Sequence, residues 1–184
     1  NVAEIGLEDG NDTVLVGNIA YNITGKVLEK SIAEGGYFAK AVFTTQKEVA
    51  DRVLAAPGTR ECGAITYLVQ AYGDVTHLGD IPSDAFYPSP EVDSSVIEID
   101  FSSGKKFESD EDLFMALVRG LFNYRRKTTR KGLIISPKFS LEREEIDELM
   151  GIAEVDSRKR PEELTLKEFD SLAQVLQERL RGEE

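Results

Sequence analysis

The sequence predicts an α/β fold, in which part of a layered sheet is followed by a small α-helical subdomain. Two observations support this prediction. Short β-branched runs alternate with amphipathic segments over residues 1–104, whereas only helical spacing of apolar residues follows over residues 105–184. The boundary is placed at Ser102–Gly104, where a polar, glycine-containing stretch ends the first pattern. With 41% hydrophobic residues, the chain can form a core.

The expected elements follow from the spacing of apolar residues. Thr13–Gly17 is a short β-branched run that predicts a buried parallel strand. Further strands are expected at Tyr37–Thr44, Asp74–Ile81 and Val96–Phe101, and helices at Thr24–Glu34, Thr45–Ala55 and Ala64–Tyr72. Beyond the boundary we expect three helices, at Leu113–Phe122 after capping residues in Ser109–Asp112, at Ser140–Gly151 and at Thr165–Leu180.

Two positions could carry chemistry in the α/β part. The tetrapeptide Asn18-Ile19-Ala20-Tyr21 follows the first expected strand, and ligands bind outside the carboxyl ends of strands in open α/β sheets. Phe86 lies in a loop, Ser83–Pro90, before the last strand. These residues alone do not establish a catalytic site, because an Asn at a strand end is often a turn former and loop aromatics often fill a core.

Four segments together resemble the small-subunit ribosomal RNA adenine N6-dimethyltransferase family (KsgA type). Val16–Ile23 matches the family's Gly-Asn-[Leu/Ile]-Pro-Tyr-Asn-Ile signature, and Gln46–Arg52 matches its Gln-Lys-Glu-Val-x-x-Arg helix. Phe86–Val96 matches Phe-x-Pro-x-Pro-x-Val-Asp-Ser, and Phe122–Thr128 matches Phe-Asn-x-Arg-Arg-Lys-Thr. Arg160–Leu164 resembles a C-terminal motif of the same family. Order and spacing agree over nearly the whole chain.

The resemblance implies a fold, a reaction and a cofactor. The fold is the later half of a Rossmann-like class I methyltransferase sheet, followed by a helical RNA-binding subdomain. The reaction is S-adenosylmethionine-dependent N6-dimethylation of two adjacent adenines near the 3′ end of small-subunit rRNA, in a pre-30S-type ribosomal particle. We expect a cytoplasmic monomer.

The resemblance also implies roles for the strand-end residues. Asn18 would meet the target amine beside the cofactor, Tyr21 would stack on the adenine, and Phe86 would cover its other face. The lone pair of N6 is delocalised into the ring, so acceptors for both N6 hydrogens, the Asn18 side chain and the Ile19 carbonyl, would favour the more nucleophilic tetrahedral nitrogen. Ala20 stands where the family has proline, so this turn lacks a fixed φ.

A basic stretch is expected to bind RNA although the chain has a net charge of −12. Residues 113–139 contain seven basic residues and no acidic residue. A local patch acts within about a Debye length, ~8–10 Å, so an acidic protein can carry one. The residues expected to contact phosphates are Arg125, Arg126, Lys127, Arg130 and Lys131. The alternatives are a solvated helix face, or pairing of Arg125 or Arg126 with an acidic residue of the α/β part.

The cofactor site is expected to be incomplete. The family's glycine-rich loop, its ribose-binding acid and its adenine-binding Asp precede the first strand expected here. We therefore expect an N-terminally truncated form that is inactive alone and binds S-adenosylmethionine weakly at most. Gly6 and Gly10 lack the Gly-x-Gly-x-Gly spacing, and neither Glu8 nor Asp12 is assigned to the missing acids.

Other classes of site are not supported by the sequence. His77 and Cys62 have no neighbouring ligands, so we expect no metal site, and a single cysteine favours a reducing compartment. We expect neither a membrane span nor a signal peptide in Asn1–Asp12. Two rival functions remain, a non-catalytic RNA-binding ribosome assembly factor and a large-subunit rRNA adenine methyltransferase of the macrolide-resistance type. Phe122–Thr128 and the long helical tail favour the small-subunit group.

Overall fold

The chain forms two compact units. The computed structural model describes residues 13–56, 58–59, 61–139 and 141–182. Of these described residues, those within 13–55 and 68–106 form unit 1, and those within 56–67 and 107–182 form unit 2. The expectations for residues 1–12 lie outside the described residues. The sequence patterns did not indicate that residues 56–67 group with the helical unit.

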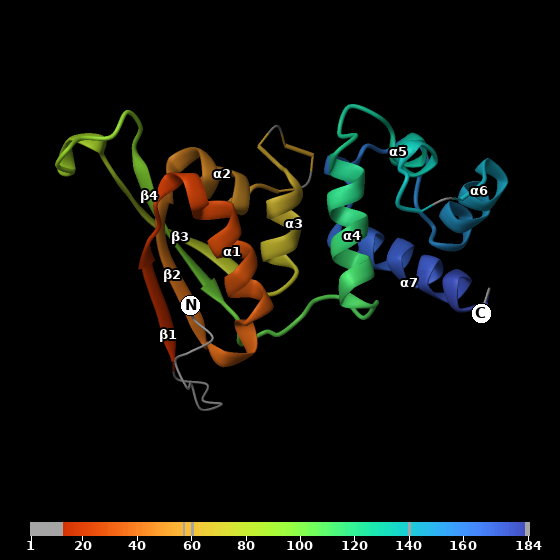
Figure 1. Ribbon diagram of the computed structural model, residues 1–184, viewed down its shortest axis with the longest axis horizontal. Helices are drawn as coiled ribbons and strands as arrows, with labels where there is room; N and C mark the ends of the chain where they lie inside the picture. Colours follow the sequence, from red (N-terminus) through yellow and green to blue (C-terminus); the bar gives the residue numbers. More distant parts are fainter. Residues whose placement is uncertain (1–12, 57, 60, 140, 183–184) are drawn as a thin grey trace. The chain divides into compact units, whose positions relative to one another are not determined.

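Unit 1 contains a four-stranded sheet of order β1-β2-β4-β3 (Figure 1). Its strands are β1 (Val14–Asn18), β2 (Lys40–Gln46), β3 (Asp74–Ile81) and β4 (Ser94–Asp100). β1 and β2 are parallel, because helix α1 (Thr24–Ala33) connects them as a crossover. β4 runs antiparallel to both β2 and β3. This arrangement confirms the predicted α/β class.

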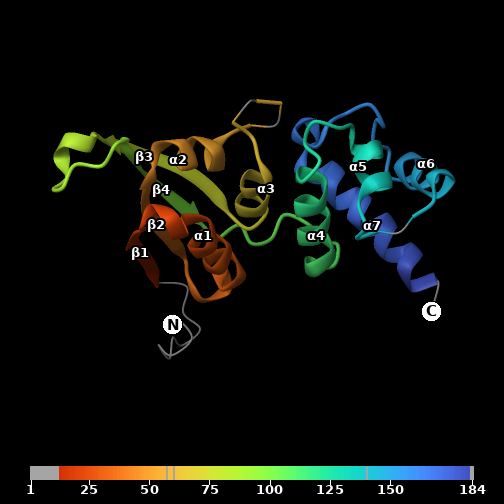
Figure 2. The ribbon, with the colours of Figure 1, turned by 45° about the horizontal axis from the view of Figure 1, so that its top comes forward.

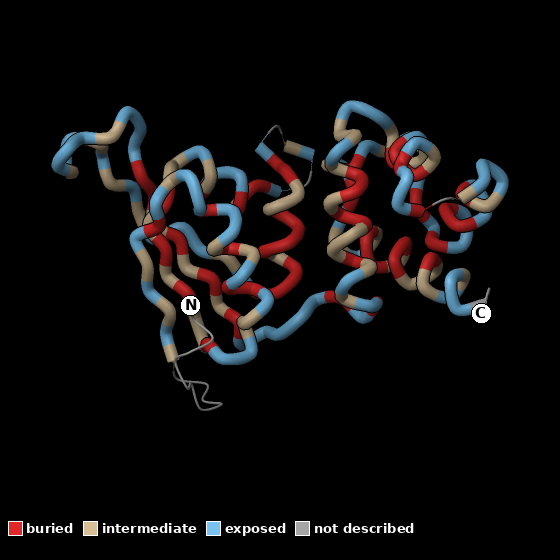
Figure 3. The backbone as a smooth tube through the Cα atoms, viewed as in Figure 1, coloured by how far each residue is buried: buried red, intermediate tan, exposed pale blue. Residues whose placement is uncertain are grey.

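The two faces of the sheet differ in character. On one face, alternate residues such as Phe43 and Ile97 are fully buried, as the alternating colours along the strands show (Figure 3). Helices α1 and α2 (Lys47–Leu54) lie on the same side of this sheet (Figures 1 and 2). On the other face, Lys40 Nζ of β2 lies 2.9 Å from Glu98 Oε1 of β4. Period-2 alternation of apolar and polar residues in β2 and β4 therefore places the core on one face.

The prediction that the first strand is buried is wrong for the described structure. β1 pairs with β2 alone among the described strands, and Val14 and Val16 are 49% and 72% exposed. An apolar, β-branched run predicts that a strand forms. Whether that strand lies at the centre or at an edge depends on long-range pairing, which the local sequence does not encode.

Unit 2 packs helices around an apolar core. Its helices are α4 (Glu111–Phe122), α5 (Thr129–Ile135), α6 (Arg143–Ile152) and α7 (Leu166–Gly182), and α3 (Ala64–Gln70) begins in this unit and ends in unit 1. The Asp110 side chain accepts a hydrogen bond from Leu113 N at 2.9 Å, which confirms the predicted cap of α4. Tyr67 ties residues 56–67 to this unit, because its hydroxyl donates to Leu164 O at 2.6 Å and its ring packs edge-on against Phe169.

Two expectations for the helical unit differ from the structure. Helix α5 was not predicted, because its first turn is polar and basic and shows no apolar stripe. Its start is capped by Thr128, whose Oγ1 accepts from Lys131 N at 3.3 Å. Helix α6 begins at Arg143 behind a reciprocal Glu142–Glu145 cap, whereas the expected start, Ser140, lies outside the described residues. In the described ranges, no helix has the length and apolar character needed to cross a bilayer.

Candidate active site

The predicted site residues meet at one edge of the sheet in unit 1. β1 ends at Asn18, whose register partner is Thr44 near the end of β2. The antiparallel strand β4 begins at this edge, since Ser94 pairs with Gln46 of β2 and with Ile81 of β3. The carboxyl ends of three strands and the start of the fourth therefore frame one opening, where open α/β sheets bind ligands.

A hollow of ≈ 390 Å³ lies at this edge, and we call it the aromatic hollow. It is lined by Asn18, Ile19, Ala20, Tyr21, Phe86, Tyr87, Pro88 and Pro90. All five residues assigned from the sequence to the chemistry are in this lining. Segments that are more than 60 residues apart in the chain thus form its two walls, one from the turn after β1 and the other from the loop between β3 and β4.

The wall after β1 is held to the sheet by its backbone and by one tyrosine. Ile19 N donates to Thr44 O at 3.0 Å, and the Ile19 side chain is buried. Tyr21 begins a short 3-10 turn, and its hydroxyl lies 2.9 Å from Ser94 Oγ. The Asn18 side chain is exposed at the strand end, so it can reach a ligand in the hollow. Sequence reasoning missed Ser94, although it lies within the Phe86–Val96 run.

The other wall is a loop fixed at its base. Ser83 N donates to the Asp93 carboxylate at 2.9 Å, and Ser89 Oγ donates to Ser83 O at 2.8 Å. These bonds close the loop on itself before β4 begins. Phe86 is half-buried in the loop, whereas Tyr87 is fully exposed beside it. The loop therefore presents one half-buried and one fully exposed aromatic residue at the hollow.

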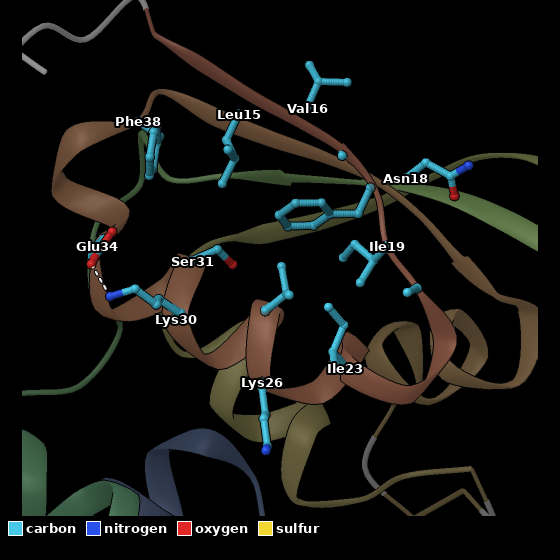
Figure 4. A pocket seen from close by; sticks show the side chains of 14 residues that line it. Leu15, Val16, Asn18, Ile19, Ile23, Lys26, Lys30, Ser31, Glu34 and Phe38 are labelled. Atoms are coloured by element: carbon cyan, nitrogen blue, oxygen red, sulfur yellow. Dashed lines mark hydrogen bonds and ion pairs between the residues drawn. The ribbon is translucent and has the colours of Figure 1, made fainter. Parts of the chain in front are cut away.

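A second, larger hollow of ≈ 620 Å³ lies between β1 and α1, and we call it the apolar hollow (Figure 4). Leu15, Val27, Phe38 and Phe43 are among its apolar lining residues. Asn18, Ile19 and Ala20 line this hollow as well as the aromatic one. In Figure 4, Asn18 marks one end of the apolar hollow and Phe38 the other. The strand-end tripeptide is thus the boundary shared by the two hollows.

A charged cluster stabilises the end of β3 next to the site. The Asp80 carboxylate accepts from Ser95 Oγ at 2.6 Å and from Lys47 Nζ at 3.1 Å, and lies 2.8 Å from His77 Nε2. Hydrogen bonds from Ser95, His77 and Lys47 together lower the pKa of Asp80. These contacts connect the end of β3 to β4 and to helix α2. No cluster of three metal-binding side chains occurs among the residues that the structure describes.

Cys62 lies in unit 2, beside the side chains of Tyr67 and Thr66. Its side chain is fully buried. Burial raises the pKa of the thiol, so the reactive thiolate is disfavoured.

The five basic residues assigned to RNA binding all lie in the helical unit, but they differ in their contacts. Arg125 Nε lies 3.8 Å from Glu162 Oε2, and Arg130 forms a two-pronged pair with Asp147 of α6. Arg125 therefore contacts a carboxylate of the helical unit. The exposed members of the set are Arg126, Lys127 and Lys131.

Solved structures share this arrangement of sheet and helices. A dimethyladenosine transferase from Plasmodium falciparum aligns over 97% of this chain and 71% of its own, with a TM-score of 0.73 and 22% identity. The 23S rRNA methyltransferase ErmE aligns over 89% of this chain and 65% of its own, with a TM-score of 0.60 and 18% identity. The fold is therefore that of the Rossmann-like class I methyltransferases.

The sequence comparison is more specific. Residues 2–180 match the sequence model of the family described as ribosomal RNA adenine dimethylase, and the chain belongs to this family. The ribosomal RNA small subunit methyltransferase A of Clostridium acetobutylicum is 37% identical over 163 residues, which cover 86% of this chain and 57% of that protein. The protein of the same name from Alkaliphilus oremlandii is 34% identical, over 93% of this chain and 60% of its own length. The chain thus spans less than two thirds of these relatives.

Proposed function

We propose that the protein transfers methyl groups from S-adenosylmethionine to N6 of adenine in small-subunit rRNA, at two adjacent adenines near its 3′ end. The observation that carries the proposal is the aromatic hollow, which Asn18 and Ile19 line together with the aromatic residues Tyr21 and Phe86. The two curated relatives are named as small-subunit rRNA methyltransferases, which supports the same substrate here. A cytoplasmic small-subunit particle would present this rRNA.

The polar atoms at the strand end suit an exocyclic amine. An adenine amine carries two hydrogens and a delocalised lone pair. We propose that the Asn18 side-chain oxygen accepts one hydrogen and the Ile19 carbonyl oxygen accepts the other. This pairing would favour the tetrahedral nitrogen, whose lone pair is free to attack a methyl donor. Fixed acceptors need no reorganisation during the reaction, so they stabilise developing charge effectively.

The aromatic residues of the two walls suit an adenine that is flipped out of the stacked RNA bases. Chemistry on a base requires the nucleotide to be extruded and held between aromatic or apolar side chains. We propose that Tyr21 stacks on one face of the adenine and Phe86 covers the other. Tyr87, exposed beside Phe86, would contact the flanking nucleotides.

The described residues fit one end of the cofactor. S-adenosylmethionine supplies the methyl group when bound. Asn18, Ile19 and Ala20 line both hollows, so the backbone and side chain here would hold its methyl-bearing end next to the base. The apolar hollow is lined mainly by hydrocarbon, with Lys26, Lys30 and Glu34 as charged residues, and Glu34 is already paired with Lys30. We therefore assign no other part of the cofactor to these residues.

We propose that the helical unit binds RNA through exposed cations. Arg126 and Lys127 lie in the turn after α4, and Lys131 lies in the first turn of α5. Cations that are free of carboxylates can pair with phosphates without first breaking an ion pair. Arg125 and Arg130 already contact Glu162 and Asp147, so we assign them mainly to the support of this surface.

Methyl-transfer assays of two asparagine variants test the proposal. Replacement of Asn18 by Ala should lower kcat by a factor on the order of 10²–10³, as loss of a transition-state hydrogen bond does elsewhere. Asn22, which is exposed but lines neither hollow, provides the control Asn22→Ala. Both variants should bind small-subunit rRNA as the wild type does. Activity is measured on the longest native polypeptide that contains these residues, as tritiated methyl incorporated into small-subunit particles.

The same assay separates the rival functions. A non-catalytic assembly factor would bind small-subunit rRNA and incorporate no methyl groups. A large-subunit enzyme would methylate 23S rRNA instead; the fold alone allows this, since ErmE shares it. A fall of less than about tenfold in Asn18→Ala would remove Asn18 from the reaction centre.

A further inference from the structure

We propose that Ser94 is a positioning residue, which fixes the ring of Tyr21 where an adenine can stack on it. The inference rests on the proposed function, in which Tyr21 forms one face of the base site. Ser94 does not line either hollow and would act through Tyr21 alone.

The contact joins a short turn to an interior strand of the described sheet. Ser94 Oγ lies 2.9 Å from the Tyr21 hydroxyl, and Ser94 has no exposed surface. Ser94 is the first residue of β4 and is paired with Gln46 on one side and Ile81 on the other. Tyr21, in contrast, lies in a three-residue 3-10 turn after an edge strand. The sheet therefore supplies a fixed anchor for the tip of the ring.

The hydrogen bonds within the turn after Ile19 are local. Ile23 N donates to Ala20 O at 3.0 Å, and Thr24 Oγ1 lies 3.4 Å from the same carbonyl. Both contacts close the turn on itself and neither reaches the sheet. Ala20 does not lock φ as a proline would. Among the side-chain hydrogen bonds of the described turn, the bond between Tyr21 and Ser94 is the one that reaches the sheet.

The opposite wall is anchored at the neighbouring residue. Asp93 accepts Ser83 N through its carboxylate at 2.9 Å and Lys47 N through its carbonyl at 3.0 Å. The base of the Phe86 loop is thereby tied to the residue that precedes Ser94. Asp93 and Ser94, which are consecutive in the chain, thus hold the two aromatic walls at adjacent points.

Ser95 provides a matched control. Like Ser94, it is a serine of β4 with no exposed surface, so Ser95→Ala makes a similar small change in the same strand. Its hydroxyl donates to Asp80 at 2.6 Å, and Tyr21 is not its partner. A general weakening of β4 should affect both variants, whereas loss of the Tyr21 contact should affect Ser94→Ala alone.

Steady-state methyl transfer gives the first test. Ser94→Ala should lower kcat roughly tenfold, in line with the loss of a buried hydrogen-bond partner, and should leave the KM for RNA unchanged. Tyr21→Phe removes the same bond from the other side and should give a similar fall. The double variant should be no slower than the slower single variant, because the two changes remove one interaction. Ser95→Ala should keep the wild-type kcat.

A fluorescence signal gives a second test that needs no methyl transfer. The probe is an rRNA 3′-end oligonucleotide with 2-aminopurine at the target adenine, bound to each variant. Stacking on a fixed ring quenches emission, so the bound probe should be brighter in Ser94→Ala and in Tyr21→Ala than in the wild type. Ser95→Ala should match the wild type. Circular dichroism and thermal melting verify that each variant is folded.

The outcomes distinguish this inference from the proposed function. Equal behaviour of Ser94→Ala and Ser95→Ala in both assays, or additive losses in the double variant, would overturn the role of Ser94 while leaving the enzyme assignment intact. A wild-type protein that transfers no methyl would overturn the proposed function, and the fluorescence comparison would still decide whether Ser94 fixes Tyr21.

Discussion

Removal of the three exposed cations of the helical unit should weaken RNA binding in a salt-dependent way. The variant replaces Arg126, Lys127 and Lys131 by Gln. These side chains are exposed in the structure, whereas Arg125 and Arg130 contact Glu162 and Asp147. Each phosphate contact releases condensed counterions and contributes about 0.7 to the salt slope for single strands and about 0.9 for duplex. Three lost contacts should therefore flatten the slope of log K against log salt by about 2–3 units.

Fluorescence anisotropy with a labelled 3′-end rRNA fragment measures the slope over a series of KCl concentrations. The matched control replaces Lys26, Lys30 and Arg52, exposed cations of unit 1, by Gln, which makes the same change in net charge. The control should keep the wild-type slope. Binding losses should be alike for RNAs of different sequence, because phosphate contacts position the protein and base contacts specify it. An unchanged slope in a folded triple variant would refute the proposed RNA surface.

Three further perturbations test other parts of the structure. Phe86→Ala removes the ring that we propose covers one face of the adenine and should lower kcat/KM roughly tenfold, since a base–aromatic stack contributes about 1–3 kcal/mol; full activity would exclude Phe86 from the site. Burial opposes ionisation of Asp170, but hydrogen bonds from Ser109 and Glu108 outweigh it and lower its pKa. The ionised Asp170 carboxylate should thus stabilise the folded protein above the unfolded pKa of about 4, and this stabilisation should be lost as pH falls through the folded pKa. Asp170→Asn should therefore lower the free energy of unfolding, measured in urea, by about 1–3 kcal/mol at pH 7 and by less in acid. An equal cost at both pH values would contradict this linkage. Because burial raises the pKa of Cys62, iodoacetamide should label it far more slowly in the folded than in the urea-unfolded protein, and equal rates would contradict its burial.

The helices and strands that the sequence predicted are those whose own residues show a recognisable pattern. The strand predicted at Asp74–Ile81 has the observed bounds of β3, and the apolar stripe after Asp110 predicted α4. Helix α5 escaped prediction because its polar first turn has no stripe, although Thr128 is a typical N-cap residue that could have indicated it. The order of the strands and the edge position of β1 depend on pairing between distant segments.

The same distinction applies to the candidate site. Asn18, Tyr21 and Phe86 were found because their motifs are contiguous in the sequence, and the structure brings them together in one hollow. The contact of Tyr21 with Ser94 spans 73 residues and leaves no periodic signal. Pairing of Arg130 with Asp147 was missed for the same reason, since composition shows where charges are but not which of them meet. The roles of these residues stay predictions.

The central claim is that this family member methylates N6 of adenines in small-subunit rRNA. Its most direct test is mass spectrometry of nucleosides from RNase fragments of small-subunit particles, after incubation with S-adenosylmethionine and the longest native polypeptide that contains these residues. The account predicts N6,N6-dimethyladenosine at two adjacent adenines in the 3′-end fragment, and none with Asn18→Ala. Particles that bind the protein and remain unmethylated, or methyl groups found only in large-subunit rRNA, would contradict it.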